Sequence, residues 1–549
     1  MSVTTDDKRT LILGPPGTGK TTALMAIIRS LLEQGYSSRD IGFVSYSRAS
    51  VEDATIRVIA ATGIEESRWP WFRTLHSAYS RILRVPKDSY ITAADIKQMD
   101  RFDLGARDEG SENGYDVPVK NDEQKRDDEL RGALDWCRSR MVPHHYGVAR
   151  LSNPALGVRY TDFGAEYKRL RDRLGKHDHT DILEMALANR CEIPVRVLIV
   201  DEAQDLSPLQ VACVEITIEG CDRAWVAGDD DQAIYEFQGS SPDWLIALDK
   251  RTDWVTQVLG KSWRCPEDVR SRAEVIAKRL PNRASKPYTA RDGAGAYRTG
   301  VSIQDAAAAI ASETGSVLVL CRSRKYCAAW GSILRRRKVP YAIERGGNSP
   351  FGERGLRGVI DTLGKLHNGD TVTAGDLRWV ANSPWAPSST KADQGVFARG
   401  AKKVIKEIAA ANPARQIDPR DNDDIADCGL DDIIRHDPWD LLGMVRKWSN
   451  DAGDVREDLR WLRSAWDACG GAWPECLPVV TTWHASKGRE ADLVVIDPSL
   501  PRPAANALES LDTAGPEHRT AYVALTRTRH TALIVEPDQE APGAYPFPA

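Results

Sequence analysis

Features of a secreted protein, of a cysteine-bound metal site and of a membrane span are missing from this sequence. Its ten cysteines are scattered and no two of them form a C-x-x-C pair, which argues against a zinc ribbon, a redox motif or a cysteine-framed iron–sulfur cluster. The N-terminus MSVTTDDKRT lacks the basic-then-apolar order of a signal peptide, and no apolar run approaches the roughly 18 residues of a membrane span. These absences predict a cytoplasmic protein with reduced thiols and no membrane contact.

Basic residues are not in excess. Lys and Arg number 74 and Asp and Glu number 79, so the formal net charge is −5. A general polyanion-binding surface is therefore not implied, and any nucleic-acid contact has to come from local grooves. The 549 residues, of which 42% are hydrophobic, predict a globular chain of about three or four domains.

Short apolar runs rich in β-formers alternate with helix-like segments. The runs are TLILG, IGFVSYS, VRVLIVD and RAWVAGD, and later SVLVLCRS, PVVTTWHAS, DLVVID and TALIVEP. Buried strands separated by helices predict parallel sheets, and the two groups of runs predict two sheet domains. Helix-like sequence near 86–190 and near 346–475 predicts a helical insertion into each of them.

A glycine-rich stretch follows the first run. LILGPPGTGKTTALMAII has the pattern of a strand, then Gly14-x4-Gly19-Lys20-Thr21, then an amphipathic helix. Such glycines let backbone N–H groups close around phosphates at a helix N-terminus. We expect Lys20 to reach the β- and γ-phosphates and Thr21 to ligate Mg²⁺. The alternative is a plain glycine-rich turn, and the eight-residue match in its strand–helix context favours the phosphate site.

A second strand supplies the acidic groups that such a site needs. VRVLIVDEAQD ends an apolar run in Asp201 and Glu202. Asp201 is expected to hold Mg²⁺ through its water shell, and Glu202 to polarise the attacking water. Solvated loop acids are the alternative when the two residues are taken alone, because an Asp-Glu pair at the end of a strand is common. Together with the phosphate loop they predict a nucleoside triphosphatase.

Eight segments in order resemble the motifs of superfamily 1 helicases of the UvrD/Rep/PcrA type. They are GPPGTGKT, FVSYSRASVEDATIRV, FRTLHSAYSRILR, LIVDEAQDLSPLQ, VAGDDDQAIYEFQGS, LGKSWRCPEDV, TTWHASKGRE and AYVALTRTRH, from Gly14 to His530. The resemblance implies an α/β fold with two RecA-like parallel-sheet motor domains, each carrying a mainly helical inserted accessory domain. The predicted boundaries are 1–85 and 186–260 for the first motor domain, 86–185 for its insertion, 261–345 and 476–549 for the second motor domain, and 346–475 for the second insertion.

The resemblance also assigns roles in a site that takes ATP and Mg²⁺. Arg264 and Arg527 become arginine fingers, whose guanidinium groups suit the charge on a γ-phosphoryl group; Trp263 stacks on the base and Glu490 contacts the ribose. Arg529 has weaker support and is equally explained as structural. The predicted catalytic residues are Lys20, Glu202, Gln232, Arg264 and Arg527. The predicted nucleotide-binding residues are Gly14, Pro15, Pro16, Gly17, Thr18, Gly19, Lys20, Thr21, Thr22, Trp263 and Glu490, with Thr21 and Asp201 as metal ligands.

For DNA, the resemblance implies a single strand that crosses both sheet domains and stacks its bases on aromatic side chains. The predicted contacts are Ser47, His76, Tyr235, Phe237 and His484. Stacking suits a motor because it tolerates every base. Packing in the core is the alternative for the aromatics, and a structural role is the alternative for the histidines.

The segment AGDDDQAIYEFQG is interpreted as a link between the nucleotide site and the DNA-binding residues. The resemblance places Asp229 near the magnesium site and lets Gln232 sense the γ-phosphate, while Asp230 and Asp231 organise the turn. Tyr235 and Phe237 then face a DNA base.

Two departures from the family concern the nucleotide. The glutamine motif that the family carries upstream of the phosphate loop is missing from the residues before Gly14, and Thr22 stands where an arginine often packs on the base. We therefore predict weak discrimination among nucleoside triphosphates. Arg489, Ala491 and Gln238 also depart from the family at its DNA-contacting positions, which predicts looser coupling of the translocation step.

The leading hypothesis is an ATP-dependent helicase that translocates 3′ to 5′ on single-stranded DNA and unwinds duplex, with single-stranded and tailed duplex DNA as partners. A motor subunit of a nuclease or replication complex, without autonomous unwinding, is the alternative. A degenerate scaffold is disfavoured by the intact phosphate-site residues, and an RNA substrate stays open. We expect a bacterial or phage protein of repair or replication that is a monomer or a weak dimer.

Overall fold

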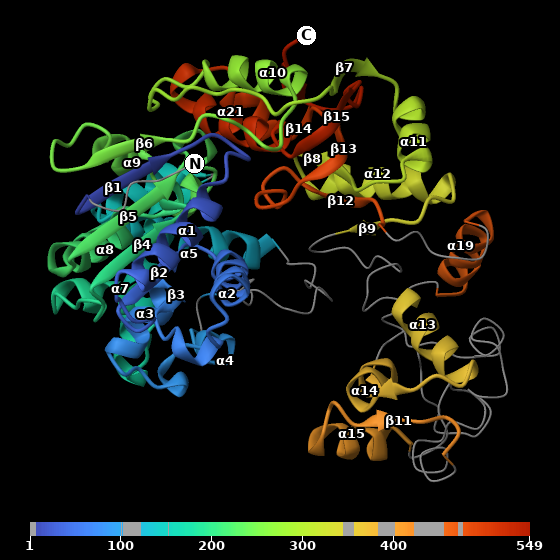
Figure 1. Ribbon diagram of the computed structural model, residues 1–549, viewed down its shortest axis with the longest axis horizontal. Helices are drawn as coiled ribbons and strands as arrows, with labels where there is room; N and C mark the ends of the chain where they lie inside the picture. Colours follow the sequence, from blue (N-terminus) through green and yellow to red (C-terminus); the bar gives the residue numbers. More distant parts are fainter. Residues whose placement is uncertain are drawn as a thin grey trace. The chain divides into compact units, whose positions relative to one another are not determined.

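The computed structural model describes residues 7–99, 102, 122–151, 153–343, 356–382, 401–421, 455–469 and 476–549 (Figure 1). The chain divides into two compact units. Unit 1 comprises Met1–Ser111, Val117–Gly300 and Ser486–Ala549, and unit 2 comprises Glu112–Asp116 and Val301–Ala485. The predicted insertions 86–185 and 346–475 lie partly outside the described residues, and the four-part domain assignment stays a prediction.

Unit 1 contains a six-stranded sheet in which every strand pair is parallel. Its order is β3 (Phe72–Thr74), β2 (Ile41–Ser45), β4 (Val197–Asp201), β5 (Arg223–Gly228), β1 (Arg9–Leu13) and β6 (Val255–Val258). Leu13 at the end of β1 pairs with Gly228, and Ser45 pairs with Asp201. Because parallel strands end at the same edge, the phosphate loop, Asp201 and the acidic segment after β5 are brought together there.

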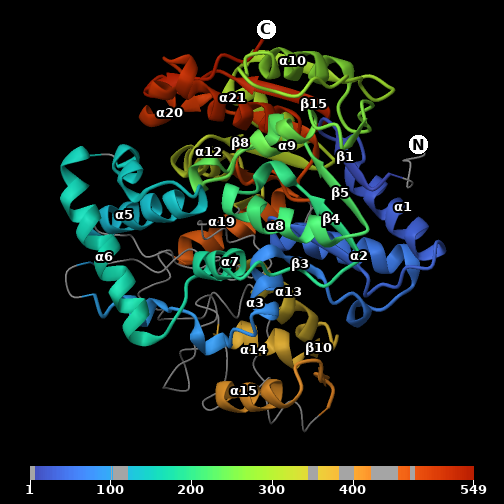
Figure 2. The same ribbon diagram turned by 90° about the vertical axis from the view of Figure 1, so that its left-hand side faces the viewer.

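Alternate side chains of these strands enter two separate hydrophobic cores, as the two-residue repeat of a strand requires. Ile12 and Phe43 pack with α1 (Lys20–Glu33) and α2 (Arg48–Thr62). Leu11 and Leu13 face the opposite side, which is covered by α3 (Leu75–Ile82), α7 (His179–Ala188), α8 (Pro208–Gly220) and α9 (Asp243–Leu248) (Figure 2). The sheet is therefore buried on both faces, which explains its unbroken apolar runs.

The charged segment between β3 and β4 is helical where it is described. It forms α4 (Ala93–Ile96), α5 (Asp122–Ser139), α6 (Gly157–Leu174) and α7. Helices α5 and α6 have their own core, in which Phe163 and Tyr167 are fully buried. Arg138 is buried beside α7 and pairs with Asp178 at 2.7 Å. The helical insertion predicted here is thus seen in part.

A second six-stranded sheet has the order β7 (Ala296–Val301), β15 (Thr528–Val535), β13 (Ala491–Ile496), β8 (Val317–Cys321), β12 (Val479–Thr482) and β9 (Ala342–Ile343). The pairs β13/β15, β8/β12 and β9/β12 are parallel. Two such sheets confirm the predicted α/β class. Unit 1 adds α10 (Glu267–Ala277), α20 (Arg502–Ala507) and α21 (Leu511–Leu525).

Unit 2 is mainly helical outside its strands. Its described helices are α11 (Ile303–Ser312), α12 (Arg324–Arg336), α13 (Leu356–His367), α14 (Ala374–Asn382), α15 (Ala401–Ala411) and α19 (Val455–Ala468). A two-residue antiparallel pair, β10 (Val372–Thr373) with β11 (Gln416–Ile417), lies among them. Within the described ranges, no helix is both long enough and apolar enough to cross a bilayer.

Candidate active site

A cavity of about 900 Å³ gathers most of the predicted site residues. All of its lining residues belong to unit 1, although they come from parts of the sequence as distant as Pro16 and Arg527. The predicted residues that line it are Pro16, Gly17, Thr18, Gly19, Lys20, Thr21, Thr22, Ser47, Asp201, Glu202, Gln232, Tyr235, Trp263, Arg264, Glu490 and Arg527. The structure therefore brings the proposed phosphate, metal and base contacts around one space.

The phosphate loop has the backbone geometry that anion binding requires. Gly17 and Gly19 have φ angles of 73° and 85°, which favour glycine, and Gly19 caps the N-terminus of α1. A Cβ atom on Gly14 would lie 2.5 Å from the Thr18 hydroxyl, which itself donates to Pro15 O at 2.9 Å. These contacts fix the loop directly in front of the N-terminus of α1, a helix of 14 residues.

Lys20 points back into this loop. Its ammonium group donates to Gly14 O at 2.6 Å. Burial lowers the pKa of Lys20, although Asp229, Glu202 and Asp201 oppose that effect. The cation is held at the loop by acceptors that a phosphate would outcompete, because a phosphate carries full charge.

Thr21 and Asp201 meet at the first turn of α1. The Thr21 hydroxyl donates to Asp201 Oδ2 at 3.2 Å, and Glu202 N donates to Asp201 Oδ1 at 2.9 Å. Burial, aided by the neighbouring Glu202, raises the pKa of Asp201 to about 6. A buried carboxylate beside a hydroxyl suits a hard divalent cation, which would favour the ionised form. The donors present therefore fit Mg²⁺; no cluster of three His, Cys, Asp or Glu side chains suited to a metal occurs among the described residues.

Glu202 has an unusual backbone conformation with a φ of 53°, which a non-glycine residue adopts only when its surroundings enforce it. Burial opposes ionisation of its side chain, but Lys487 and Lys20 outweigh that effect and lower its pKa. Lys487 Nζ lies 3.5 Å from Glu202 Oε2 and also bonds Asp205. Burial raises the pKa of Asp205 to about 7. Glu202 is thus the ionised acid of the pair.

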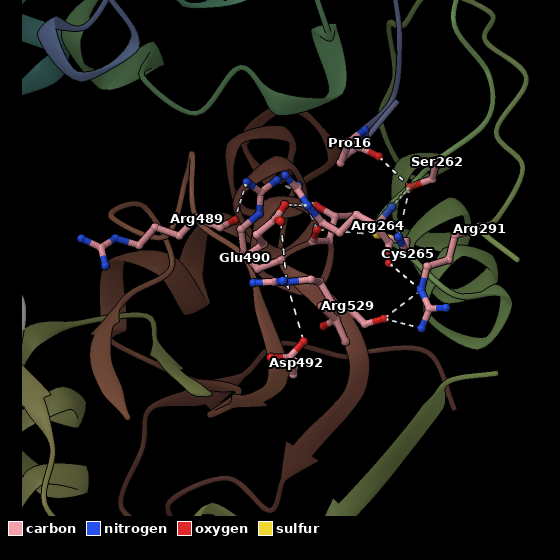
Figure 3. Close-up of polar contacts among 12 residues, drawn as sticks. Pro16, Ser262, Arg264, Cys265, Arg291, Arg489, Glu490, Asp492 and Arg529 are labelled. Carbon is pink, nitrogen blue, oxygen red and sulfur yellow. Dashed lines mark hydrogen bonds and ion pairs between the residues drawn. The ribbon is translucent and has the colours of Figure 1, made fainter. Parts of the chain in front are cut away.

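The segment around Arg264 contacts the phosphate loop directly. Trp263 N donates to Gly17 O at 2.7 Å, and the Ser262 hydroxyl donates to Pro16 O at 3.0 Å (Figure 3). A Cβ atom on Gly17 would lie 2.5 Å from Arg264 Cβ. The Trp263 side chain is 62% exposed, so it lines the cavity instead of packing in the core, the alternative considered from the sequence.

Arg527 and Gln232 both line the cavity and bond each other there. Arg527 Nη2 donates to Gln232 Oε1 at 3.0 Å, and Gln232 Nε2 donates to Asp229 Oδ2 at 2.7 Å. Burial lowers the pKa of Arg527 to about 10. The amide of Gln232 is thereby fixed between the Arg527 guanidinium group and the Asp229 carboxylate. A change in the charge bound beside Arg527 would therefore alter the hydrogen bonding of Gln232.

Three carboxylates after β5 surround a buried lysine that the sequence reasoning missed. Lys286 has a fully buried side chain and lies 3.0 Å from Asp229 Oδ1 and 3.1 Å from Asp231 Oδ2; it also bonds Asp230. Arg283 donates twice to Asp231, at 2.9 and 2.6 Å. Burial alone would lower the pKa of Lys286, but the three carboxylates outweigh it and raise that pKa. Asp229 thus binds Lys286 as well as Gln232, while Asp230 and Asp231 anchor the turn.

The aromatic residues of this segment differ in exposure. The Tyr235 ring stacks on Tyr46 with centroids 5.1 Å apart, and Lys487 Nζ lies 5.5 Å from its centroid. Phe237 is 53% exposed. Trp136 on α5 donates to Glu236 O at 3.2 Å, which ties this segment to the helical insertion. Phe237 is therefore the more accessible platform of the two.

The other three predicted DNA contacts do not share one environment, because Ser47 lines the same cavity as Tyr235 whereas His76 and His484 do not. Ser47 caps α2 by accepting from Ser50 N at 3.0 Å. His76 lines a second cavity of about 740 Å³ and lies edge-on to His179. His484 belongs to unit 2, where burial and Arg322 lower its pKa to about 3. His484 is thus neutral at pH 7 and offers hydrogen bonding instead of charge.

Four residues near the site were not predicted from the sequence, and only two of them stand within a recognised motif. Lys487 stands within TTWHASKGRE and Tyr46 within FVSYSRAS, so both were in recognised motifs without an assigned role. Lys286 and Arg283 stand in PNRASKPYT, which belongs to none of the eight motifs. Only the tertiary structure brings these two to the acidic segment.

Comparison with known families gives an independent identification of the first part of the chain. Residues 1–253 match the family described as UvrD/REP helicase N-terminal domain. This stretch contains the phosphate loop, Asp201, Glu202 and the acidic segment with its aromatics.

Distant relatives extend the similarity over most of the chain. The ATP-dependent DNA helicase UvrD2 of Mycobacterium tuberculosis is 24% identical over 585 aligned residues, which cover 95% of this chain and 76% of that protein. The ATP-dependent DNA helicase Rep of Escherichia coli is 22% identical over 402 aligned residues, which cover 68% of this chain and 58% of that protein.

Proposed function

Because this chain belongs to the UvrD/Rep helicase family of superfamily 1, we propose that it couples Mg-ATP hydrolysis to 3′-to-5′ translocation on single-stranded DNA and unwinds duplex autonomously. The family is one of ATP-dependent DNA helicases, so ATP use follows from membership. The direction, the autonomous unwinding, the metal and the residue roles belong to the proposal.

The observation that carries the proposal is the continuity between the nucleotide cavity and an aromatic segment. Gln232 accepts from Arg527 at one end of that segment, and Tyr235 lies three residues further along. Both side chains line the same cavity. A change in the bonding of Gln232 is therefore transmitted to the aromatic platform over a short, buried path.

The residues divide the chemistry among them. Thr21 and Asp201 would hold Mg²⁺, which when bound supplies charge neutralisation at the β- and γ-phosphates. Lys20 moves from Gly14 O to the phosphates, and Glu202 polarises the attacking water. Arg264 and Arg527 stabilise the charge that develops on the γ-phosphoryl group.

Strand displacement on duplexes with 3′ or 5′ single-stranded tails tests the proposal directly. We expect ATP-dependent displacement from the 3′-tailed duplex and none with Lys20→Ala, because that variant loses the ammonium group at the phosphate loop. A preference for the 5′ tail would overturn the direction. ATPase stimulation by single strands without displacement would instead favour the motor-subunit function, and absence of any stimulation would contradict both.

Discrimination among nucleoside triphosphates is expected to be weak. On the base side of the cavity, Trp263 offers a stacking surface and Thr22 offers no guanidinium group. Specificity for one base comes from groups that are left unpaired when the wrong base binds, and Thr22 supplies no such group where the family often has an arginine, so we expect kcat/KM for GTP and CTP within about a hundredfold of that for ATP. The measurement is hydrolysis at subsaturating concentration, and a larger preference for ATP would contradict the prediction.

Phe237→Ala is expected to impair unwinding while leaving ATP hydrolysis without DNA unchanged. The ring is exposed and does not line the nucleotide cavity, and loss of one stacking platform weakens DNA binding by about 1–3 kcal/mol. Fluorescence anisotropy with a labelled oligonucleotide measures the binding. Leu511→Ala, which also removes an exposed apolar side chain, is the control; normal unwinding by Phe237→Ala would rule out the stacking role.

A further inference from the structure

Arg264 is held by a carboxylate in the structure, although the proposed function requires it at the γ-phosphate. Its Nε atom donates to Glu490 Oε2 at 2.5 Å, and its Nη1 atom donates to Thr526 O at 3.4 Å (Figure 3). The side chain of Arg264 is only 16% exposed, against 40% for Glu490. An arginine partly withdrawn from water keeps such a partner until a stronger anion replaces it.

The other oxygen of Glu490 faces a second arginine. Arg529 Nε lies 3.6 Å from Glu490 Oε1 and 3.8 Å from Asp492 Oδ1. Charges therefore alternate along the series Arg264, Glu490, Arg529 and Asp492. Glu490 divides its negative charge between the two arginines, so each arginine weakens the hold of the other.

Backbone contacts fix the spacing of this series. Glu490 directly precedes β13, Arg529 lies on β15, and these strands are paired with Ala491 opposite Thr528. Arg291 donates to Arg264 O at 3.1 Å and to Arg529 O at 2.8 Å (Figure 3). The two arginines are thus positioned by main-chain contacts, and only their side chains remain to change partner.

We propose that Glu490 and Arg529 set the preference of the site for ATP over ADP by controlling the release of Arg264. This inference rests on the proposed function, in which Arg264 meets the γ-phosphoryl group. With ADP bound, Arg264 keeps Glu490. With ATP bound, Arg264 transfers to the γ-phosphate and Glu490 keeps Arg529, so no carboxylate is left unpaired. Arg529 is thereby a positioning residue that lowers the cost of the transfer.

The proposal predicts opposite effects from removing the two side chains. Glu490→Gln frees Arg264 and should raise the ratio of the ADP Kd to the ATPγS Kd by about threefold to fivefold, as expected for one partly exposed ion pair. In Arg529→Gln, Arg264 is the remaining arginine beside Glu490 and is held more strongly. This variant should therefore lower the ratio of the ADP Kd to the ATPγS Kd by a similar factor. A ribose contact by Glu490, as the resemblance implies, would weaken both nucleotides equally and leave the ratio unchanged.

The test is isothermal titration of the full chain with Mg-ADP and Mg-ATPγS. Arg529→Lys retains the charge and should keep the wild-type ratio, and retained ADP binding shows that each variant is folded. In the double variant Glu490→Gln/Arg529→Gln, the effect of Arg529→Gln should disappear, because Arg529 acts through Glu490.

Three results would overturn the inference: a ratio unchanged within twofold in both single variants, a raised ratio in Arg529→Gln, or an Arg529 effect that persists without Glu490. Failure of the wild-type chain to bind either nucleotide would instead refute the nucleotide site of the proposed function. The two failures are thus distinguishable.

Discussion

Glu202→Gln is expected to lower kcat for ATP hydrolysis by about 10²- to 10⁴-fold while leaving the KM for ATP nearly unchanged. The amide keeps the size of the side chain and its place in the cavity, but it is not a base. Glu202 is ionised at neutral pH, since Lys487 and Lys20 lower its pKa. Its loss therefore removes an interaction made with the attacking water and spares nucleotide binding.

Steady-state hydrolysis with and without single-stranded DNA measures this effect. Glu219→Gln is the matched control, because Glu219 pairs with Arg190 on the exposed surface of α8 and should leave kcat unchanged. A reduction below tenfold would mean that another group serves as the base. Asp205 would be the next candidate, because burial raises its pKa to about 7 and it shares Lys487 with Glu202.

Lys286→Met is expected to lower the free energy of unfolding by about 3–5 kcal/mol, the usual cost of leaving buried charge without its partner. The methionine side chain replaces most of the stem volume but leaves Asp229, Asp230 and Asp231 without the cation that they surround. Urea denaturation followed by tryptophan fluorescence measures the loss. Since Asp229 also holds the amide of Gln232, coupling of ATP hydrolysis to DNA should weaken as well.

Two further variants separate charge from packing at this position. Lys278→Met removes a surface lysine that pairs with Glu274 and should cost less than about 1 kcal/mol. Adding Asp230→Asn to Lys286→Met should recover part of the lost stability, because it removes one of the mutually repelling carboxylates. If the second substitution destabilises the protein further, the cluster is held by packing instead of charge balance.

The central strands were predictable from the sequence and the edge strands were not. All eight apolar runs became strands: β1, β2, β4 and β5 in the first sheet and β8, β12, β13 and β15 in the second. The missed strands β3, β6, β7 and β9 are the four edges of the two sheets. An edge strand contacts water, so its sequence needs no unbroken apolar run, as the exposed ends of β6 illustrate.

The phosphate-site residues were predictable for a related reason. Gly14 to Thr21 are consecutive residues, so their spacing in the sequence is enough to predict the loop and the helix N-terminus that follows it. The order of motifs also sufficed to predict the similarity to UvrD/Rep helicases that the comparisons found over residues 1–253 and, at low identity, over most of the chain.

Tertiary structure alone decided which charges meet. Lys286 reaches Asp230 across 56 positions, Arg264 reaches Glu490 across 226, and Lys487 reaches Asp205 across 282. Pairs so far apart leave no local pattern, because any lysine or arginine could in principle serve any carboxylate until the fold brings two of them together. The sequence by itself thus determined most of the residues that line the cavity, whereas the fold determined the ion pairs that hold Asp229, the partner of Gln232, and Arg264 in place.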